Sequence, residues 1–213
     1  MHDDEIIYIV DDDEAVRDAI AKLVQSVGLT PKCYSSAESF LKEFHDDIFS
    51  CCLVLDVRMK GIGGIELLKI MNEKNYIVPT IIITGHGDIP MAVEALHNGA
   101  MNFIEKPFRN QILLDAITLA IRESKKLKNI EDKNKELIGL YSSLTDRELQ
   151  ISTCISHGLS NKQIAGELNL SPRTVETHRA NIMKKMNSTN MLDLLTKLIY
   201  LTSLKSPAET ELI

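Results

Sequence analysis

In the first half of the chain, four apolar segments each run into a polar or charged side chain. The segments and the residues that follow them are 6–10 with Asp11, Asp12 and Asp13; 51–55 with Asp56; 80–83 with Thr84; and 102–105 with Lys106. If these segments are parallel strands, their carboxyl ends meet at one edge of the sheet, where open α/β folds build their sites. We therefore expect carboxylates, a hydroxyl and an ammonium group to converge there, as a Mg²⁺-assisted phosphoryl site requires.

An acidic cluster of this kind implies a cation, because a dianionic phosphate would otherwise be repelled. Mg²⁺ takes few protein carboxylates and completes its octahedron with water and phosphate oxygens. One of the aspartates can also be the nucleophile and form an acyl phosphate. Lys106 would place a positive charge on the phosphoryl oxygens, and Thr84 would donate a hydrogen bond to them. A single aspartate at a strand end is more often a helix cap, but four matched strand ends favour the phosphoryl site.

The elements that position these residues alternate between strand and helix signals. Hydrophobic patterns predict strands at 6–10, 30–34, 51–55, 79–83 and 102–105, and helices at 14–26, 36–44, 64–73, 90–98 and from 109 onward. This alternation predicts an α/β fold, a doubly wound five-stranded parallel sheet with helices on both faces. The uninterrupted apolar runs at 51–55 and 80–83 are typical of strands that are covered on both sides.

The composition is that of a globular protein with two different modules. The chain has 213 residues, of which 44% are hydrophobic and 25% charged, and its net charge is −6. The excess of acid falls in residues 1–122, and the remainder is nearly balanced, which favours two modules with different partners. No apolar run is long enough to span a membrane, and the acidic start differs from a secretory signal. We expect a cytoplasmic protein with no membrane contact and with reduced thiols at Cys33, Cys51, Cys52 and Cys154.

The second half of the chain is predicted to be entirely helical. Thr145 and Glu148 have the spacing of a capping box, Ser160 can cap the next helix, and Pro172 can open another at its first position. The pattern predicts an all-α four-helix domain with a scaffold helix at 161–168, a turn at 169–171, a recognition helix at 172–186 and a final helix at 189–204.

These patterns predict domains at 1–122 and 141–213, joined by a helical linker at 123–140. The linker is rich in Lys and Glu and carries Leu127, Ile130 and Leu137 at spacings of three and seven. It is predicted to be either a solvated spacer or a weak coiled-coil-like dimer stalk. Three apolar positions leave both interpretations open.

The motifs of the first domain resemble those of a known family. YIVDDDEAVR, LVLDVRMKGIGGIELL, PTIIITGHGDIPMAVEAL and NFIEKPF resemble the successive motifs of a flavodoxin-like response-regulator receiver domain, in the FixJ-like group of the NarL/FixJ family. The resemblance covers about residues 5–122. It implies that Asp56 accepts the phosphoryl group and that Asp11, Asp12, Asp56 and the backbone carbonyl of Arg58 bind Mg²⁺. It also implies switch residues, which are Thr84, Phe103 and Lys106, although Phe103 is equally interpretable as a core aromatic.

The loop after residue 56 departs from the family pattern. The family usually has Met-Pro-Gly where this chain has Met59, Lys60 and Gly61. Without the proline the loop is expected to be less constrained, and Lys60 adds a positive charge near the pocket. Arg58 and His86 fall at positions that, in receivers, line the path by which water reaches the phosphoryl group. Bulky side chains there would slow hydrolysis of the acyl phosphate. His86 is equally interpretable as a surface loop residue.

The second domain resembles a LuxR-type helix-turn-helix over about residues 142–205, on the run LTDRELQISTCISHGLSNKQIAGELNLSPRTVETHRANIMKKMNSTN. A helix in the major groove needs phosphate contacts to position it and a few side chains to read bases. The residues suited to phosphates are Lys162, Arg173, Thr174, His178, Arg179, Lys184 and Lys185. By the family's register, the residues that face bases are Glu176, Thr177 and Ala180. Many relatives carry a basic residue in place of Glu176, so a different sequence preference is expected.

The resemblance implies a phosphorylation-controlled transcription factor rather than an enzyme. Its expected partners are a sensor histidine kinase, double-stranded promoter DNA, RNA polymerase and a second copy of the chain. The expected dimer surface comprises Met91, Val93, Glu94, Leu96 and Ala100. Two alternatives remain. A Mg²⁺-dependent phosphohydrolase would place a second Asp where this chain has Arg58, and a phosphorylation switch of another kind would bind protein or RNA through its helical tail.

Overall fold

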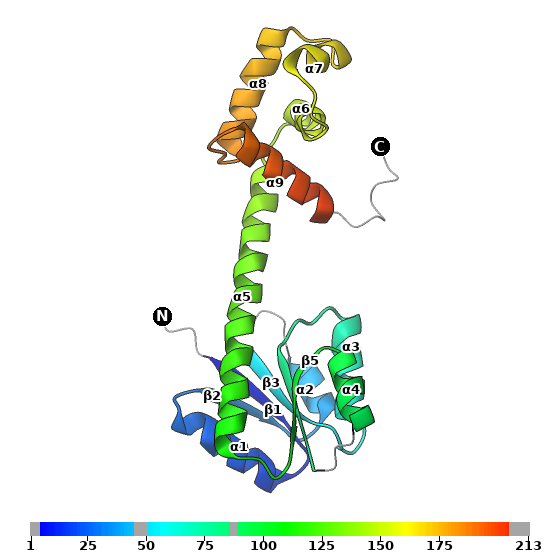
Figure 1. The fold of residues 1–213 in the computed structure, drawn as a ribbon, viewed down its shortest axis with the longest axis vertical. Helices are drawn as coiled ribbons and strands as arrows, with labels where there is room; N and C mark the ends of the chain where they lie inside the picture. Colours follow the sequence, from blue (N-terminus) through cyan, green and yellow to red (C-terminus); the bar gives the residue numbers. More distant parts are fainter. Residues whose placement is uncertain (1–4, 45–50, 86–88, 205–213) are drawn as a thin grey trace. The chain divides into compact units, whose positions relative to one another are not determined.

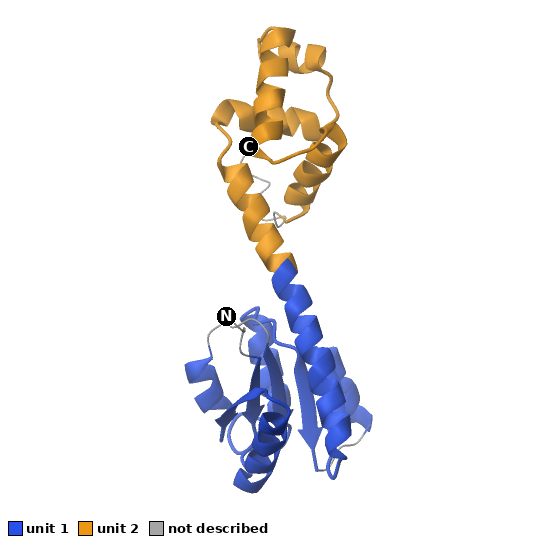
Figure 2. Ribbon diagram, turned by 90° about the vertical axis from the view of Figure 1, so that its left-hand side faces the viewer, with its two compact units in different colours: residues 1–129 blue, residues 130–213 orange. Residues whose placement is uncertain are grey.

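The computed structural model describes residues 5–44, 51–85 and 89–204. The chain divides into two compact units, residues 1–129 and 130–213 (Figure 2). The boundary between the units falls inside the segment that was expected to be a linker. Within the described part of the chain, no helix combines the length and the apolar character that a membrane span requires.

Unit 1 contains the predicted five-stranded parallel sheet, with strand order β2-β1-β3-β4-β5 (Figure 1). The strands are β1 (Ile6–Val10), β2 (Thr30–Tyr34), β3 (Cys51–Asp56), β4 (Thr80–Thr84) and β5 (Ala100–Glu105). The helices between them are α1 (Glu14–Ser26), α2 (Ala37–Glu43), α3 (Gly64–Glu73) and α4 (Ile89–His97), and α5 (Asn110–Ser142) follows β5. The predicted fold class is therefore confirmed.

Side chains of alternate residues along the strands enter two separate cores, one on each face of the sheet. Along β1, Ile7 and Ile9 pack with residues of α1 and α5, whereas Tyr8 and Val10 pack with residues of α2, α3 and α4. Phe40 of α2 is fully buried and contacts the Tyr8 ring edge-on at a centroid distance of 5.5 Å. Because both faces are covered, the central strands can be apolar throughout.

Strand β5 begins at Ala100, two residues before the predicted start. Gly99 has a φ of +87°, which allows the chain to turn out of α4 and pair Ala100 with Thr80. A register shift between Thr80 and Ile81 accommodates the extra residue. Ala100 is consequently buried in the core, with 7% of its surface exposed.

Unit 2 is helical, with α6 (Asp146–Ser156), α7 (Asn161–Glu167), α8 (Pro172–Lys185) and α9 (Met191–Leu204). The expected start signals are present. Thr145 with Glu148 and Ser160 with Gln163 form capping boxes, and the Ser171 hydroxyl accepts from Thr174 N–H beside Pro172. The four helices share a core formed by residues such as Ile151, Ile164, Val175, Ile182 and Leu194.

The end of α5 belongs to the core of unit 2. Leu137, Leu140 and Tyr141 pack against that core, and the Tyr200 hydroxyl donates to Asn134 Oδ1 at 2.9 Å. The part of α5 from Asn134 onward therefore contacts its own unit and is more than a solvated spacer.

A partly buried ion pair ties the start of α6 to the end of α8. Lys185 Nζ donates to Glu148 Oε2 at 2.6 Å and to the Ser143 carbonyl at 3.2 Å. The same carboxylate oxygen accepts from the backbone N–H and the hydroxyl of Thr145, each at 2.9 Å. The hydrogen bond from Lys185, aided by those from Thr145, lowers the pKa of Glu148 to about 2.

Gly64 is required by close packing at the start of α3. A Cβ atom at this position would overlap the Asp56 carbonyl oxygen and lie 3.0 Å from Val57 Cα, both of which are backbone atoms. We expect Gly64→Ala to destabilise unit 1 by about 1–3 kcal/mol through overpacking, measured by hydrogen–deuterium exchange of β3 amides. Gly85→Ala is the matched control, because a Cβ atom added there would meet no atom of the other described residues within 4 Å, its chain neighbours aside. Equal exchange rates in the two variants would contradict the packing argument.

Loss of the Lys185 ammonium should destabilise unit 2 in a pH-dependent way. Lys185→Gln leaves the buried Glu148 carboxylate without its charged partner, which should cost roughly 1–3 kcal/mol at pH 7. Because the Glu148 pKa is about 2 in the folded protein and near 4.5 otherwise, this stabilisation is fully present above about pH 5 and is lost as the pH falls toward 2. Hydrogen exchange of the α6 amides measures the difference.

Lys184→Gln is the control for this experiment, since Lys184 is exposed. A destabilisation by Lys185→Gln that stays constant from pH 7 to pH 2 would show that the ion pair is not its cause.

Candidate functional site

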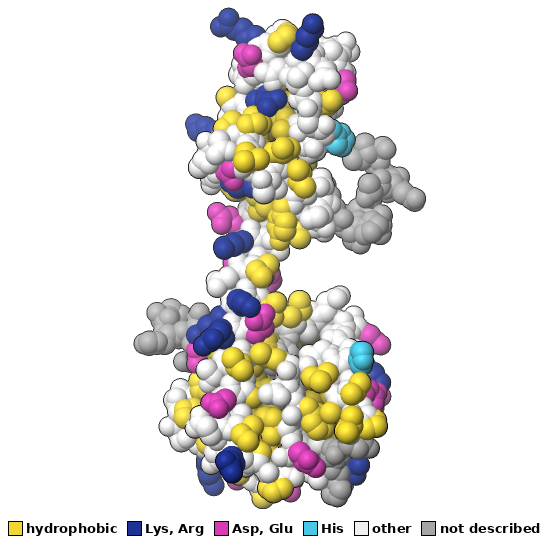
Figure 3. Space-filling model, in the orientation of Figure 1, with side chains coloured by type: hydrophobic (Ala, Val, Ile, Leu, Met, Phe, Trp, Pro, Cys, Tyr) yellow, Lys and Arg dark blue, Asp and Glu magenta, His cyan; other side chains and the backbone are white. Residues whose placement is uncertain are grey.

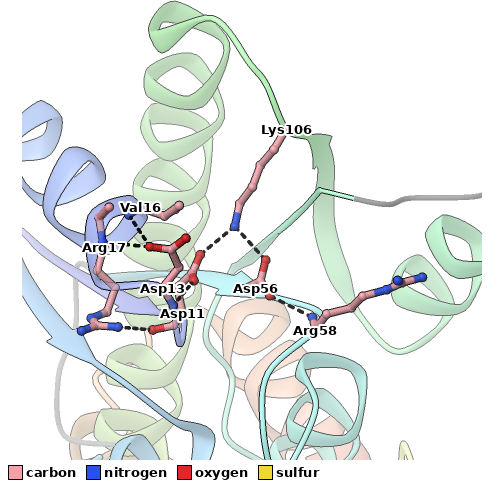
Figure 4. Close-up of polar contacts among 8 residues, drawn as sticks. Asp11, Asp13, Val16, Arg17, Asp56, Arg58 and Lys106 are labelled. Carbon is pink, nitrogen blue, oxygen red and sulfur yellow. Dashed lines mark hydrogen bonds and ion pairs between the residues drawn. The ribbon is translucent and has the colours of Figure 1, made fainter.

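Three of the predicted side chains meet at the carboxyl edge of the sheet. Asp11 directly follows β1, Asp56 ends β3 and Lys106 follows β5. Lys106 Nζ donates to Asp11 Oδ2 at 2.7 Å and to Asp56 Oδ1 at 2.8 Å, as Figure 4 shows. The side chains of Asp11 and Asp56 are 1% and 7% exposed, and that of Lys106 is 19% exposed. A buried pair of carboxylates is thus bridged by one ammonium group.

The backbone fixes the other oxygens of this pair. Asp13 N–H donates to Asp11 Oδ1 and Arg58 N–H donates to Asp56 Oδ2, both at 2.9 Å. Arg17 Nη1 donates to the Asp11 carbonyl at 2.7 Å (Figure 4). Both carboxylates are therefore oriented by the loops that follow their strands.

Asp12 completes a cluster with the composition of a hard-cation site. Asp11, Asp12 and Asp56 each offer one carboxylate oxygen, and these three oxygens lie within 4.8 Å of one another. Oxygen ligands suit Mg²⁺, and the exposed Asp12 leaves the cluster open on one side. Asp13 has a different place, since its carboxylate accepts from Ala15 and Val16 N–H and caps α1. The donor set therefore fits the expected metal.

The charges of the pocket are not balanced: the cluster holds three carboxylates, and among the described residues one ammonium, that of Lys106, contacts it. Burial raises the pKa of Asp56, the charge and hydrogen bond of Lys106 act in the opposite direction, and the Asp11 carboxylate raises it further. Burial lowers the pKa of Lys106, but its hydrogen bonds to Asp11 and Asp56 outweigh this effect and leave it raised. The site therefore holds excess negative charge, which a divalent cation would relieve.

The loop without the family's proline is held from two sides. Lys60 N–H donates to Asp12 Oδ2 at 3.4 Å, a contact that a proline could not make. On the other side, Ile62 N–H donates to Glu38 Oε1 of α2 at 3.1 Å, and the pKa of Glu38 is lowered by a hydrogen bond to its own backbone and by the one from Ile62. Gly61 has a φ of +79° and lies against the Glu38 carboxylate. Glu38 was missed from the sequence because an acidic residue in the first turn of a helix is commonplace.

The other residues named for the pocket are differently placed. Thr84 ends β4, is fully buried, and its carbonyl accepts from Lys106 N–H at 2.7 Å. Phe103 in β5 is partly buried and packs against the core that faces α2, α3 and α4. The Arg58 side chain is exposed. His86 lies outside the described residues.

Exposed apolar side chains gather on α4 and the neighbouring strand β5. Figure 3 shows apolar atoms over the part of unit 1 where Figure 1 labels α4. The large exposed residues there are Ile89 (81%), Val93 (46%), Leu96 (51%) and Met101 (40%). Ile89 and Met101 were not named from the sequence, because their exposure depends on how α4 and β5 pack.

The other residues predicted for the dimer surface are less available for contact with a partner. Glu94 pairs with Lys69 of α3 at 2.8 Å, Met91 packs partly against the core, and Ala100 is buried.

The predicted DNA-contact residues fall into two groups. Those exposed on α7 and α8 are Lys162, Arg173, Glu176, Thr177, Ala180 and Lys184. Those engaged within unit 2 or partly buried are Thr174, His178, Arg179 and Lys185. Among the second group, Arg179 donates to Asn161 Oδ1 at 2.8 Å and to Met191 Sδ at 3.0 Å. Its guanidinium therefore links α8 to α7 and to the start of α9.

Comparisons with known proteins agree with this geometry. Residues 7–118 match the response regulator receiver domain, and residues 142–198 match the bacterial regulatory proteins of the luxR family. The chain is 45% identical over 196 residues to the response regulator protein TmoT of Ectopseudomonas mendocina, covering 91% of this chain and 88% of that protein. It is 41% identical over 188 residues to the transcriptional regulatory protein FixJ of Rhizobium meliloti, covering 88% and 92%.

Two solved structures extend the likeness over both units. The response regulator StyR matches with a TM-score of 0.81 and 39% identity, covering 92% of this chain and 98% of that one. Full-length FixJ from B. japonicum matches with a TM-score of 0.55 and 39% identity, covering 94% and 98%. The chain therefore belongs to the two-component response regulators that join a receiver domain to a LuxR-type DNA-binding domain, a family of phosphorylation-dependent transcriptional regulators.

Proposed function

We propose that Asp56 accepts a phosphoryl group from a sensor histidine kinase and that this modification switches the DNA-binding activity of unit 2. The observation that carries the proposal is the bridge from Lys106 to Asp11 and Asp56. This bridge holds the buried Asp56 carboxylate at the open acidic edge of the sheet. The Lys106 ammonium beside it can donate hydrogen bonds to phosphoryl oxygens. The buried Thr84 would supply a hydroxyl hydrogen bond to the same group.

We propose that Asp11, Asp12, Asp56 and the Arg58 carbonyl hold Mg²⁺. When bound, the metal would neutralise the charge that builds up between the incoming phosphoryl group and the carboxylates. The residues of the chain do the rest. The backbone N–H groups of Asp13 and Arg58 orient the two buried carboxylates, and Lys106 compensates their charge.

The output of the switch is proposed to be a dimer. Thr84, Phe103 and Lys106 would respond to the phosphoryl group, and the surface on α4 and β5 would then pair with a second copy. Its proposed residues are Ile89, Met91, Val93, Glu94, Leu96 and Met101. Ala100 is left out because it is buried. Phosphorylation can favour the dimer only if the interface is better formed in the phosphorylated state.

Paired receivers would present two α8 helices to half-sites one helical turn apart on promoter DNA. The proposed phosphate contacts are Lys162, Arg173, Thr174, His178 and Lys184, and the proposed base contacts are Glu176, Thr177 and Ala180. Arg179 and Lys185 are proposed to position α8, since their cations already bind Asn161 and Glu148. The regulator would act in the cytoplasm, with RNA polymerase as a further partner.

Turnover of phosphate monoesters is not part of the proposal. Arg58 occupies the position where an aspartyl phosphohydrolase carries its acid/base group. Its side chain is exposed, and a guanidinium cannot lose its proton in a protein. The chain is therefore proposed to act as a stoichiometric phosphoacceptor rather than as an enzyme.

The phosphoacceptor is tested by Asp56→Asn. Incubation with acetyl phosphate and Mg²⁺ should give the wild-type chain a hydroxylamine-sensitive phosphoryl mass increment, and Asp56→Asn should give none. Asp13→Asn is the matched control, because asparagine preserves the α1 cap and Asp13 lies outside the cluster. A labile phosphoryl group on Asp56→Asn, or its absence from the wild type, would refute the assignment.

Duplex DNA binding is tested by salt titration. Each phosphate contact contributes about one to the magnitude of the negative slope of log K against log salt concentration. Lys184→Gln should therefore reduce the magnitude of that slope by about one. Lys133→Gln removes the same charge from an exposed position on α5 and should leave the slope unchanged. Fluorescence anisotropy with promoter duplex measures both. If the two variants reduce the magnitude of the slope equally, the predicted contact of Lys184 with a DNA phosphate is wrong.

A further inference from the structure

The exposed face of α8 carries its positive charges at its two ends. Arg173 lies in the first turn and Lys184 in the last, and both are exposed. The exposed residues between them are Glu176, Thr177, Ala180 and Asn181, none of which is basic. A helix with cations at both ends can be positioned by phosphates on either side of a groove, while its centre faces the base edges.

The other cations of α8 do not alter this pattern. Arg179 donates to Asn161 and Met191, and Lys185 donates to Glu148 and the Ser143 carbonyl. Both point into unit 2. The centre of the exposed face is therefore left to uncharged and acidic side chains, which can contact base edges in the major groove.

Asn181 is the residue of this face that the sequence did not single out. Its side chain is exposed, and its amide makes no hydrogen bond to any other described residue of the chain. Some other asparagines of unit 2 have internal side-chain partners, whereas Asn169 and Asn187, which both adopt a positive φ, make no side-chain hydrogen bond to a described residue. Asn161 Oδ1 accepts from Arg179, and Asn190 Oδ1 accepts from Asp193 N–H. Asparagine also lowers helix propensity relative to alanine, and no side-chain hydrogen bond to the described part of the unit compensates for this at position 181.

The position of Asn181 suits it to a base edge. It lies four residues after Thr177 and three before Lys184, a spacing that places all three on one side of the helix. The preceding residue, Ala180, is small and allows the helix to approach closely. An asparagine amide offers one donor and one acceptor, which match N7 and N6 of adenine in the major groove.

We propose that Asn181 is a specificity-determining residue that reads an adenine in each half-site. This inference rests on the proposed binding of unit 2 to duplex DNA. Asn181 would act beside Glu176, whose exposed carboxylate can accept from cytosine N4 but cannot make the donor contact that adenine N7 requires. The two side chains would therefore specify different bases.

The test is selection of bound duplexes from a randomised library by the full chain, phosphorylated with acetyl phosphate. Wild-type, Asn181→Ala and Asn181→Asp proteins are compared at one salt concentration. We expect Asn181→Ala to lose preference for adenine at one position per half-site by about tenfold, while the other positions of the motif are kept. Asn181→Asp should move that position toward cytosine, because a carboxylate accepts from N4.

Several results would overturn the proposal. An unchanged motif in both variants would show that Asn181 reads no base. Uniform weakening of binding to all sequences by Asn181→Ala, with the motif unchanged, would make it a phosphate contact. If the wild-type chain enriched no duplex at all, the proposed DNA binding itself would be wrong, and this inference would fail with it. The first two results leave wild-type DNA binding intact and are thereby distinguished from the third.

Discussion

Lys106 lies between two buried carboxylates that would otherwise repel each other. Asp11 and Asp56 are almost wholly removed from solvent, and both burial and the neighbouring Asp11 carboxylate raise the pKa of Asp56. The Lys106 ammonium, at 2.7 and 2.8 Å from the two carboxylates, opposes these effects without cancelling them. The three side chains come from the ends of β1, β3 and β5. The hydrogen bonds of Lys106 to both carboxylates therefore require those strands to be in register. The packing of unit 1 and the chemistry of its acidic edge therefore depend on the same interaction.

The same interaction makes the pocket responsive to modification. A phosphoryl group on Asp56 would bring new negative charge to a site where, among the described residues, Lys106 is the ammonium that contacts these carboxylates. The ammonium has three donors and uses two of them on Asp11 and Asp56, so we propose that the phosphoryl oxygens would compete with these carboxylates for it. Its movement, and that of the neighbouring Thr84, would carry the change to β4 and β5. The exposed apolar side chains of α4 and β5 lie next to these strands, so the proposed change of charge would reach the proposed interaction surface.

Much of the fold and of the acidic site was predictable from the sequence. What could not be predicted has a physical reason. Strand ends follow from apolar runs of definite length, so the convergence of Asp11, Asp56 and Lys106 could be expected before the structure was known. Helix starts were equally clear, because capping boxes are local. Contacts between elements distant in the sequence were not predictable. Neither the hydrogen bond from Ile62 to Glu38 nor the engagement of Lys185 by Glu148 has a sequence signal. Lys185 in particular resembled one more basic residue on a recognition helix.

A structure of the chain with Mg²⁺ and beryllofluoride, a stable mimic of the phosphoryl group, would test the central claim most directly. We predict that the mimic is bound at Asp56 and that Lys106 Nζ lies within hydrogen-bond distance of a fluoride, having given up at least one of its two carboxylate partners. If Nζ still bridged Asp11 and Asp56 with no contact to the mimic, the lysine would be a static structural tie, and the account of the switch would be contradicted.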